Sequence, residues 1–375
     1  MAPTEASASV KAPSRLRQLV ETYNDQLPLE QASLPPAEWY TDPQFDALEG
    51  QAIWRRHWLC AGPVAALSDP GTYLTGEIAG QPWVVVRGDD GEIRAFWNVC
   101  RHQGAVLVDG QGELPTNKMG DHHISCPYHG WSWQSDGSLR HAPKLTGIDC
   151  FDRASYGMWP LHVAVWGAIV MVAVAEHRPA DPPQSVLEVL NATQWQNLHL
   201  VNQHDFVVES NWKVFIDNYL DGGYHVPVAH AQLASGLDGQ SYALERGQGW
   251  SIQRCGSNGT DGRVAGVSTY AWLYPSLCIN RYGDWLDLNI VEPVDARRCR
   301  VRFFWLHVDA DLPKDELQSA LQASHQVQDE DAWLCKRVQI GKSADCYQPG
   351  RYAPRLEPLE YDFHHWLKRD YLESL

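Results

Sequence analysis

The stretch Cys126-Pro127-Tyr128-His129-Gly130-Trp131, taken together with Cys100-Arg101-His102, decides how the first half of this 375-residue chain folds. Each segment contributes one cysteine and one histidine. Each also lies at the tip of a predicted β-hairpin, where loop residues can converge on one centre. Two thiolates and two imidazoles in such loops indicate a bound metal. A structural zinc ion is one alternative, although zinc sites more often combine Cys-x-x-Cys with His-x-x-x-His.

The presence of one cysteine and one histidine in each loop favours an iron-sulfur cluster over zinc. In a Rieske [2Fe–2S] centre, two thiolates hold one iron and two imidazoles hold the other. The predicted cluster ligands are therefore Cys100, His102, Cys126 and His129. The 23 residues between His102 and Cys126 also contain His122 and His123, which belong to neither motif. We expect these two histidines to be solvated loop residues.

Short runs of Val, Ile and aromatic residues surround the two motifs. Trp83–Val86 and Ile93–Phe96 flank the turn Asp89-Asp90-Gly91, which predicts a hairpin. The apolar run Leu161–Ala175 predicts two core strands, because it falls short of the roughly 20 residues that span a bilayer. We therefore expect a β domain over residues 50–175. Before it lies a polar, proline-containing lead segment over residues 1–49, with room for one helix.

Composition excludes several other classes of protein. With 44% hydrophobic residues the chain can bury a large core, so disorder is excluded as its main state. A net charge of −16 without a basic cluster makes nucleic acid an unexpected partner. The N-terminus lacks the apolar region of a secretory signal, and a plastid leader would be longer and poorer in acids, so we expect a cytoplasmic protein. Nine scattered cysteines do not predict a disulfide framework.

The second half reads as an α+β domain over residues 176–375, after a proline-rich linker at 179–183. An apolar segment near Trp212 predicts a helix, and Tyr270–Asn280, Trp285–Val294 and Val301–Val308 predict strands. A long helix is expected from about 313 to 340. Its apolar residues recur at helical spacing; they are Leu317, Leu321, Val327, Leu334 and Val338.

A second metal site is predicted in this half, around His225 and His230. On a regular helix, residues five apart point about 140° away from each other, so both could not bind one ion. Gly222, Gly223 and Pro227 supply the irregularity that would bring them together. Two imidazoles and one carboxylate leave positions open for dioxygen, as in non-haem Fe(II) oxygenases.

The carboxylate is expected from the long helix. Asp331 lies four residues after Val327 and three before Leu334, inside the apolar stripe, where an acid is costly unless it is paired or metal-bound. Asp331 is therefore the first candidate for the third ligand. Glu330 is the second, although it and Asp329 are expected to face solvent.

The order of these motifs over nearly the whole chain resembles the α subunits of Rieske non-haem iron oxygenases. The sequence Asn-Trp-Lys-Val-Phe-Ile-Asp-Asn-Tyr-Leu-Asp-Gly-Gly-Tyr-His-Val-Pro at 211–227 is similar to that of the choline monooxygenase branch, as are the segments 279–283 and 330–335. The resemblance implies an all-β Rieske domain and a helix-grip catalytic domain with an antiparallel sheet, on which the lead segment packs. The implied cofactors are a [2Fe–2S] cluster and a mononuclear Fe(II).

The resemblance also implies how electrons reach the second site. In the family, an acid just before the first iron-binding histidine connects it to the cluster of a neighbouring subunit. Asp221 is the matching residue, although many members have the acid at the position of Gly222, and Asp217 is the weaker alternative. A homotrimer or a multiple of it is implied. No flavin or dinucleotide motif is evident, so a separate ferredoxin or reductase would supply electrons.

The implied reaction is monooxygenation of a small quaternary ammonium compound. Choline hydroxylated at its alcohol carbon gives the hydrate of betaine aldehyde, in glycine betaine synthesis; hydroxylation of an N-methyl group of glycine betaine or carnitine would instead release formaldehyde. Such a cation is best recognised by aromatic faces. Candidates on the predicted strands are Tyr270, Trp272, Tyr274, Tyr282 and Trp285. A carboxylated substrate would also need an Arg or Lys, for which Arg281 is available. A pure electron carrier and a zinc-stabilised binding protein are the other classes left open.

Overall fold

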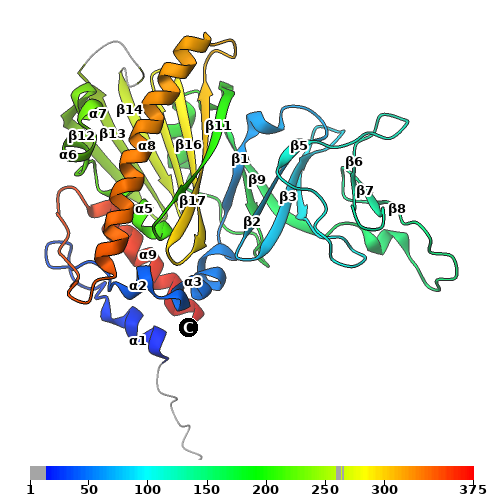
Figure 1. Cartoon of the computed structure of the whole chain (residues 1–375), viewed down its shortest axis with the longest axis horizontal. Coiled ribbons are helices and arrows are strands. Elements are labelled where there is room, and N and C mark those ends of the chain that lie inside the picture. The colour runs from blue at the N-terminus through cyan, green and yellow to red at the C-terminus, as the bar shows by residue number, and fades with distance from the viewer. Residues whose placement is uncertain (1–13, 259–262, 264–265) are drawn as a thin grey trace, which may run out of the picture.

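The computed structural model describes residues 14–258, 263 and 266–375. Figure 1 shows two large antiparallel sheets side by side, with a small sheet at the far end of the first. The longer helices gather around the second sheet. The fold therefore has an all-β part that carries the Cys-His loops and an α+β part that carries the His-His-Asp residues.

The first sheet has seven strands in the order β1-β10-β9-β4-β3-β2-β5. They are β1 (Leu59–Pro63), β2 (Thr72–Ile78), β3 (Gln81–Arg87), β4 (Ile93–Trp97), β5 (Gln111–Glu113), β9 (Pro160–Trp166) and β10 (Ile169–Ala173). The predicted hairpin is confirmed, because β3 and β4 pair through the turn at Asp89-Asp90-Gly91. The two strands predicted within Leu161–Ala175 are β9 and β10, and every residue of β10 is buried.

The small sheet extends from the end of the first sheet and carries the second Cys-His loop. It contains β6 (His123–Ser125), β7 (Ser132–Gln134) and β8 (Leu139–His141). Trp131 and Trp133 anchor it in a separate apolar cluster that also includes both cysteines, Cys100 and Cys126. The two Cys-His loops thus have a core of their own.

The second sheet also has seven strands, in the order β11-β17-β16-β15-β14-β13-β12. They are β11 (His199–Val208), β12 (Leu237–Gly247), β13 (Trp250–Ser257), β14 (Val267–Leu273), β15 (Leu277–Tyr282), β16 (Trp285–Asp295) and β17 (Arg298–His307). The prediction of one strand over Tyr270–Asn280 was wrong, because β14 and β15 are separate strands that pair with each other. Pro275 lies in the turn between them and has no N–H to donate to a ladder.

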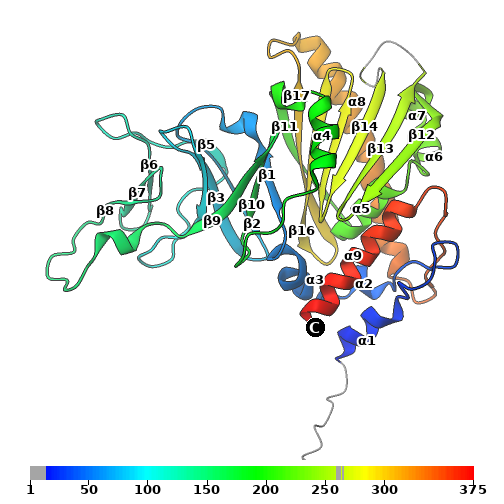
Figure 2. The same cartoon turned by 180° about the vertical axis from the view of Figure 1, so that it is seen from behind.

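Helices lie on both faces of the second sheet. Figure 1 shows α8 crossing one face, and Figure 2 shows α4 on the other. The helices are α1 (Arg15–Thr22), α2 (Glu38–Thr41), α3 (Pro43–Glu49), α4 (Gln184–Ala192), α5 (Trp212–Leu220), α6 (Val226–Ala229), α7 (Ala231–Gly236), α8 (Lys314–Lys342) and α9 (Pro358–Ser374). Shorter 3₁₀ or π turns occupy Gly50–Trp54, Val64–Leu67, Arg153–Tyr156 and Trp195–Asn197. In the described part of the chain, no helix combines the length and apolar character needed to cross a lipid bilayer.

The extent of α8 was predicted well, but its buried face was not. The buried residues are Ser324, Gln328, Asp331, Cys335, Gln339 and Lys342, whereas Val338 of the predicted stripe is exposed. Polar residues tolerate burial here because specific partners satisfy them. Gln339, for example, accepts from the Asn211 N–H at 2.8 Å and donates to the Tyr40 carbonyl at 3.1 Å.

The described part of the lead segment, from residue 14 on, contains the three helices α1, α2 and α3 rather than one, and it packs on α9. Trp39 and Phe45 contact the ring of Tyr371. Glu49 forms a fully buried ion pair with Lys213 of α5, and it also accepts from the Tyr371 hydroxyl at 2.7 Å. These contacts tie the start of the chain to the helix that precedes the His-His pair.

Candidate metal centres

The two Cys-His loops have the same backbone design. In each, the cysteine N–H donates to the carbonyl of the residue after the glycine, and the glycine N–H donates back to the cysteine carbonyl, at 2.7–3.1 Å. The glycines, Gly104 and Gly130, have φ values of +76° and +74°, which favour residues without a Cβ. Two equivalent loops therefore present their side chains to a common centre.

The four side chains match the two halves of a Rieske cluster. Cys100 and Cys126 are 3% and 4% exposed, while His102 and His129 are exposed, with ring centroids 4.9 Å apart. Burial raises the pKa of the Cys100 thiol, and the His102 N–H donates to its Sγ at 3.5 Å. Buried thiols with a main-chain donor and a pair of outward imidazoles fit a [2Fe–2S] group whose histidine-bound iron lies at the surface.

Aromatic rings fix the orientation of both imidazoles. Trp131 stacks on His102, with centroids 5.2 Å apart and an interplanar angle of 1°. Tyr128 stacks against His129 at 3.7 Å. These stacking contacts restrict the rotation of both imidazole rings.

The expectation that His122 is a solvated loop histidine was wrong. Its side chain is 12% exposed, and its Nδ1 lies 2.6 Å from Asp89 Oδ1 and its Nε2 3.5 Å from Glu113. The hydrogen bond with Asp89 raises the pKa of His122. Its ring also packs directly on Gly71, where a Cβ would lie only 2.1 Å from it. His122 thus fastens the long insertion to the β3–β4 turn, and His123 is half-buried in β6.

The second centre begins where α5 ends. Asp221 follows the helix and accepts from the Gly223 and His225 N–H groups at 2.9 and 3.0 Å. Gly222 and Gly223 adopt φ values of +65° and +77°, and a Cβ on Gly222 would lie 2.1 Å from a neighbouring carbonyl oxygen. The chain then makes the single turn α6, and His230 lies between α6 and α7. The predicted irregularity is confirmed.

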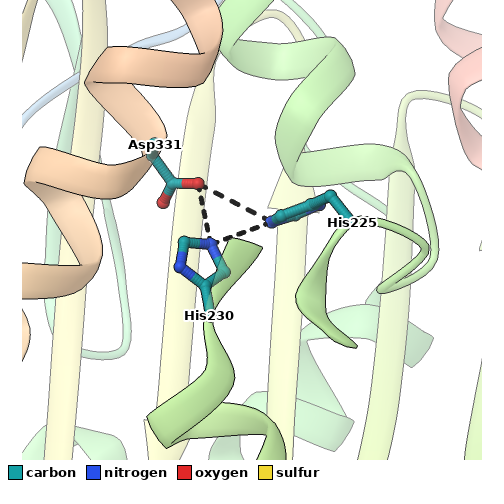
Figure 3. A group of neighbouring side chains, drawn as sticks. All are labelled: His225, His230 and Asp331. Atoms are coloured by element: carbon teal, nitrogen blue, oxygen red, sulfur yellow. Dashed lines mark hydrogen bonds and ion pairs between the residues drawn. The ribbon is translucent and has the colours of Figure 1, made fainter. Parts of the chain in front are cut away.

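His225, His230 and Asp331 converge, as Figure 3 shows. The Nε2 atoms of His225 and His230 are 3.1 Å apart. Asp331 Oδ1 lies 3.0 Å from His230 Nε2 and 3.6 Å from His225 Nε2. Ligands held about 2.1 Å from an ion at right angles lie about 3.0 Å apart. The three donors therefore fit one face of a mononuclear metal with the other positions open, the arrangement of non-haem iron oxygenases.

Each of these three residues has an outer partner. Asp221 Oδ2 lies 2.6 Å from His225 Nδ1, and Glu330 Oε2 lies 2.6 Å from His230 Nδ1. The Asn218 amide donates to Asp331 Oδ1 at 2.8 Å. Such partners fix the tautomer and direction of a metal-binding side chain. Glu330, expected to face solvent, instead holds His230, whereas Asp329 is exposed.

The pKa of His230 reflects the acids around it. Burial lowers the pKa, but the hydrogen bonds and charges of Asp331 and Glu330 outweigh burial and raise it to about 9. The imidazole therefore binds a proton tightly when no ion is bound, and a metal must displace that proton.

A cavity of about 120 Å³ adjoins the triad. This volume lies below the roughly 300 Å³ at which drug-sized pockets begin, so the cavity suits a small substrate. Its aromatic wall residues are Phe215, Tyr219, Tyr242 and Tyr270. Its amides are Asn218, Gln253, Asn280, Asn289 and Gln328. Asp221 and Asp331 also line it, but no Lys or Arg of the described residues does.

Of the five aromatic residues proposed from the sequence to contact substrate, only Tyr270 lines this cavity. Trp272 and Tyr274 instead pack on Phe363 of α9, at 5.6 and 6.4 Å between centroids. Tyr282 and Trp285 lie under the Arg263 guanidinium, at 4.9 and 5.2 Å from it. These four lie outside the cavity, because strand alternation gives the face of a sheet but not the position along it.

Arg281 is also outside the cavity. It follows Asn280 on β15, so the two side chains point to opposite faces of the sheet. Its guanidinium donates to the Trp285 carbonyl at 2.9 Å and to the Thr193 carbonyl, just after α4, at 3.4 Å. Arg281 therefore stabilises the face of the sheet that α4 covers.

Sequence reasoning missed most of the cavity wall. Phe215, Asn218 and Tyr219 recur at the spacing of one helix face, a signal that the sequence does contain. Tyr242 and Gln253 could not be found in this way, because they meet the cavity only through the register of β12 and β13. The residues of β12 and β13 alone do not reveal how the two strands align with each other.

Asp217, the alternative to Asp221, belongs to a different cluster. Its Oδ1 lies 3.1 Å from His364 Nε2, which is also 2.8 Å from the Tyr40 hydroxyl. His364 Nδ1 is 2.6 Å from the hydroxyl of Tyr352. Asp221, in contrast, touches His225 directly.

The two centres are far apart within one chain. In Figure 1 the small sheet β6–β8 lies at one end of the molecule and α6 and α7 lie at the other. The Cys-His loops and the His-His-Asp residues therefore lie toward opposite ends of a single chain.

Comparisons with known protein families match both halves. Residues 57–152 match the Rieske [2Fe-2S] domain, and residues 195–373 match the ring hydroxylating alpha subunit (catalytic domain). Chloroplastic choline monooxygenase of Arabidopsis thaliana is 37% identical, over 96% of this chain and 89% of that protein. The glycine betaine monooxygenase oxygenase subunit of Chromohalobacter salexigens is 27% identical, over 91% and 86%.

A solved structure is similar over nearly the whole chain. It is the quaternary ammonium Rieske monooxygenase CntA in complex with L-carnitine, at 25% identity and a TM-score of 0.81. The similarity covers 96% of this chain and 99% of that one. The overall fold, the two Cys-His loops and the His-His-Asp triad therefore all agree with the proteins found in these comparisons.

Proposed function

The chain belongs to the family of Rieske non-haem iron oxygenase α subunits, and on that premise we propose that it is a monooxygenase that hydroxylates choline. The product is the hydrate of betaine aldehyde, a precursor of glycine betaine. One observation carries the choice of substrate: the cavity beside the triad has an aromatic wall and acids but, among its described lining residues, no Lys or Arg. Choline is a cation without a carboxylate, and it needs no positive partner.

The cofactors of this enzyme are a Rieske [2Fe–2S] cluster and a mononuclear non-haem iron. Together they supply the electrons and the oxygen-activating centre. We propose Cys100, His102, Cys126 and His129 as the cluster ligands. We propose His225, His230 and Asp331 as the iron ligands, with Glu330 and Asp221 holding the two imidazoles. The domain limits 1–49, 50–175 and 176–375 remain a proposal.

The cavity wall supports binding of a trimethylammonium group. A quaternary ammonium has no N–H to donate, so aromatic faces and nearby negative charge are its best partners. Phe215, Tyr219, Tyr242 and Tyr270 provide the faces, and Asp221, which is not one of the proposed iron ligands, provides the charge. The carboxylate of glycine betaine or carnitine would find no Lys or Arg among the described wall residues to pair with it.

We also propose that the chain works as a homotrimer in which each cluster serves the iron of a neighbouring subunit. The separation of the two centres within one chain supports this. So do exposed apolar residues beside each of them. Tyr128 next to the cluster histidines is 63% exposed, and Val228 and Trp333 near the triad are 89% and 58% exposed. Asp221, in contact with His225, is the proposed bridge for electrons.

The electron donor is proposed to be a separate ferredoxin or reductase. The cytoplasmic location expected from the sequence stays a prediction, and the chloroplastic location in the names of plant relatives belongs to those proteins.

The test is a single-turnover experiment. Anaerobic, chemically reduced protein with intact Rieske absorbance receives O₂ with either choline or glycine betaine, and betaine aldehyde and formaldehyde are both quantified. Betaine aldehyde from choline is expected. Formaldehyde from glycine betaine, with choline untouched, would move the function to N-demethylation. The variant Asp331→Ala is the control, since it should keep the cluster absorbance and form neither product.

A further inference from the structure

Asn289 is a buried amide on the wall of the substrate cavity, and it is neither an iron ligand nor the partner of one. It lies on β16 and is 2% exposed. Its Oδ1 is fully buried and has no hydrogen-bond partner among the described residues. Several buried side-chain atoms of the described residues lack a hydrogen-bond partner, and among them only Asn289 Oδ1 belongs to a residue that lines the cavity. An unpaired buried acceptor is costly, so it marks a place where a missing partner is expected.

Neighbouring amides on the same wall are already committed. Gln253 donates to the Tyr219 carbonyl and accepts from the Tyr242 hydroxyl, both at 2.9 Å. Asn280 accepts from the Tyr219 hydroxyl at 2.8 Å. These bonds orient the tyrosines of the aromatic wall. Asn289 Oδ1 has no such partner among the described residues, so it is available to a ligand.

Asn289 and the tyrosines of the sheet lie on different parts of the cavity wall. Tyr242 and Tyr270 come from β12 and β14, whereas Asn289 comes from β16. Strands β14 and β16 are separated only by β15, so they lie two strand spacings, or about 9.6 Å, apart. The tyrosines therefore gather toward one side of the cavity and the free amide lies toward the other.

We propose that the Asn289 amide hydrogen-bonds the hydroxyl group of the substrate and so selects a quaternary ammonium compound that carries an alcohol. This inference rests on the proposed function. The ammonium end of choline has no hydrogen-bond donor, and its hydroxyl is the one group that can both donate to Oδ1 and accept from Nδ2. Asn289 thereby distinguishes the alcohol end of the substrate from the methylated end.

The experiment compares binding of choline and of ethyltrimethylammonium, which lacks the hydroxyl, to the oxidised holoenzyme by calorimetry. A hydrogen bond of ordinary net strength corresponds to about 5-fold in affinity, so the wild type should prefer choline by about that factor. Asn289→Leu should abolish the preference by weakening choline alone. Asn289→Asp keeps an acceptor and should keep the preference.

Ser251→Ala is the matched control. Ser251 lies in the same cross-strand row as Asn289, is also 2% exposed, and its Oγ is likewise without a partner among the described residues, but it does not line the cavity. This variant should bind both compounds as the wild type does. A preference for choline that survives in Asn289→Leu, with choline still oxidised by the wild type, overturns this inference alone. Wild-type protein that binds neither compound overturns the proposed function as well.

Discussion

Replacing Glu330 by Gln tests whether the acid that holds His230 matters for iron binding. The carboxylate lies 2.6 Å from His230 Nδ1, the same distance at which Asp221 holds His225. Loss of such an outer partner typically weakens metal binding by about 10- to 100-fold. Glu330 is 31% exposed, whereas Asp221 is 13% exposed, so solvent screens the Glu330 charge more. Gln also retains an oxygen that can accept from Nδ1–H. We therefore expect the lower end of the range, about 10-fold or about 1.4 kcal/mol.

The assay is anaerobic competition for Fe(II) against a chelator, with Rieske absorbance used to count folded protein. Asp329→Asn is the control, because it removes the same charge from the neighbouring, exposed position of α8. An affinity of Glu330→Gln for Fe(II) within about 2-fold of the wild type, or an equal loss of affinity in Asp329→Asn, would contradict this prediction.

Three further predictions concern stability and site geometry. Glu49→Gln leaves Lys213 buried without its partner and should lower the free energy of unfolding by about 3–5 kcal/mol, seen as a lower urea midpoint; a loss below about 1 kcal/mol would contradict this. His122→Gln should destabilise the Rieske domain most below about pH 6.5, because Asp89 raises the pKa of His122 in the folded state and the stabilisation is lost as pH rises through that folded-state pKa. A difference in thermal midpoint between wild type and variant that grows from about pH 6 to pH 9 would contradict this. Gly222→Ala places a Cβ 2.1 Å from a carbonyl oxygen at a φ of +65°, so the ratio of mononuclear iron to cluster should fall, and full iron occupancy would count against the assigned geometry.

Features that depend on a few neighbouring residues were predictable from the sequence. The β3–β4 hairpin follows from its turn residues, and the break after α5 follows from Gly222 and Gly223. The approach of His225 to His230 depends on that break. Asp331 was singled out because an acid at its position in the helix is costly, and the structure does bury it beside the two imidazoles.

Features that depend on the register of distant strands were not predictable. Tyr282 and Trp285 are on the expected face of the sheet, but they lie beyond the cavity, under Arg263. The buried face of α8 was missed for another reason: its polar residues are satisfied by partners such as Trp305, whose indole N–H donates to Ser324 at 2.9 Å. Hydrophobic periodicity cannot reveal a face that is held by hydrogen bonds.

The residues that hold the proposed iron and the residues of the sheet floor come from different parts of the fold. The proposed iron ligands and their outer partners come from α5, α8 and the turns between α5 and α7, whereas Tyr242, Tyr270 and Asn289 come from strands of the sheet floor. A change of side chain on a strand leaves the backbone of those helices and turns in place. Selection can therefore retune which small cation is oxidised, one floor residue at a time, while the oxidising centre is inherited unaltered.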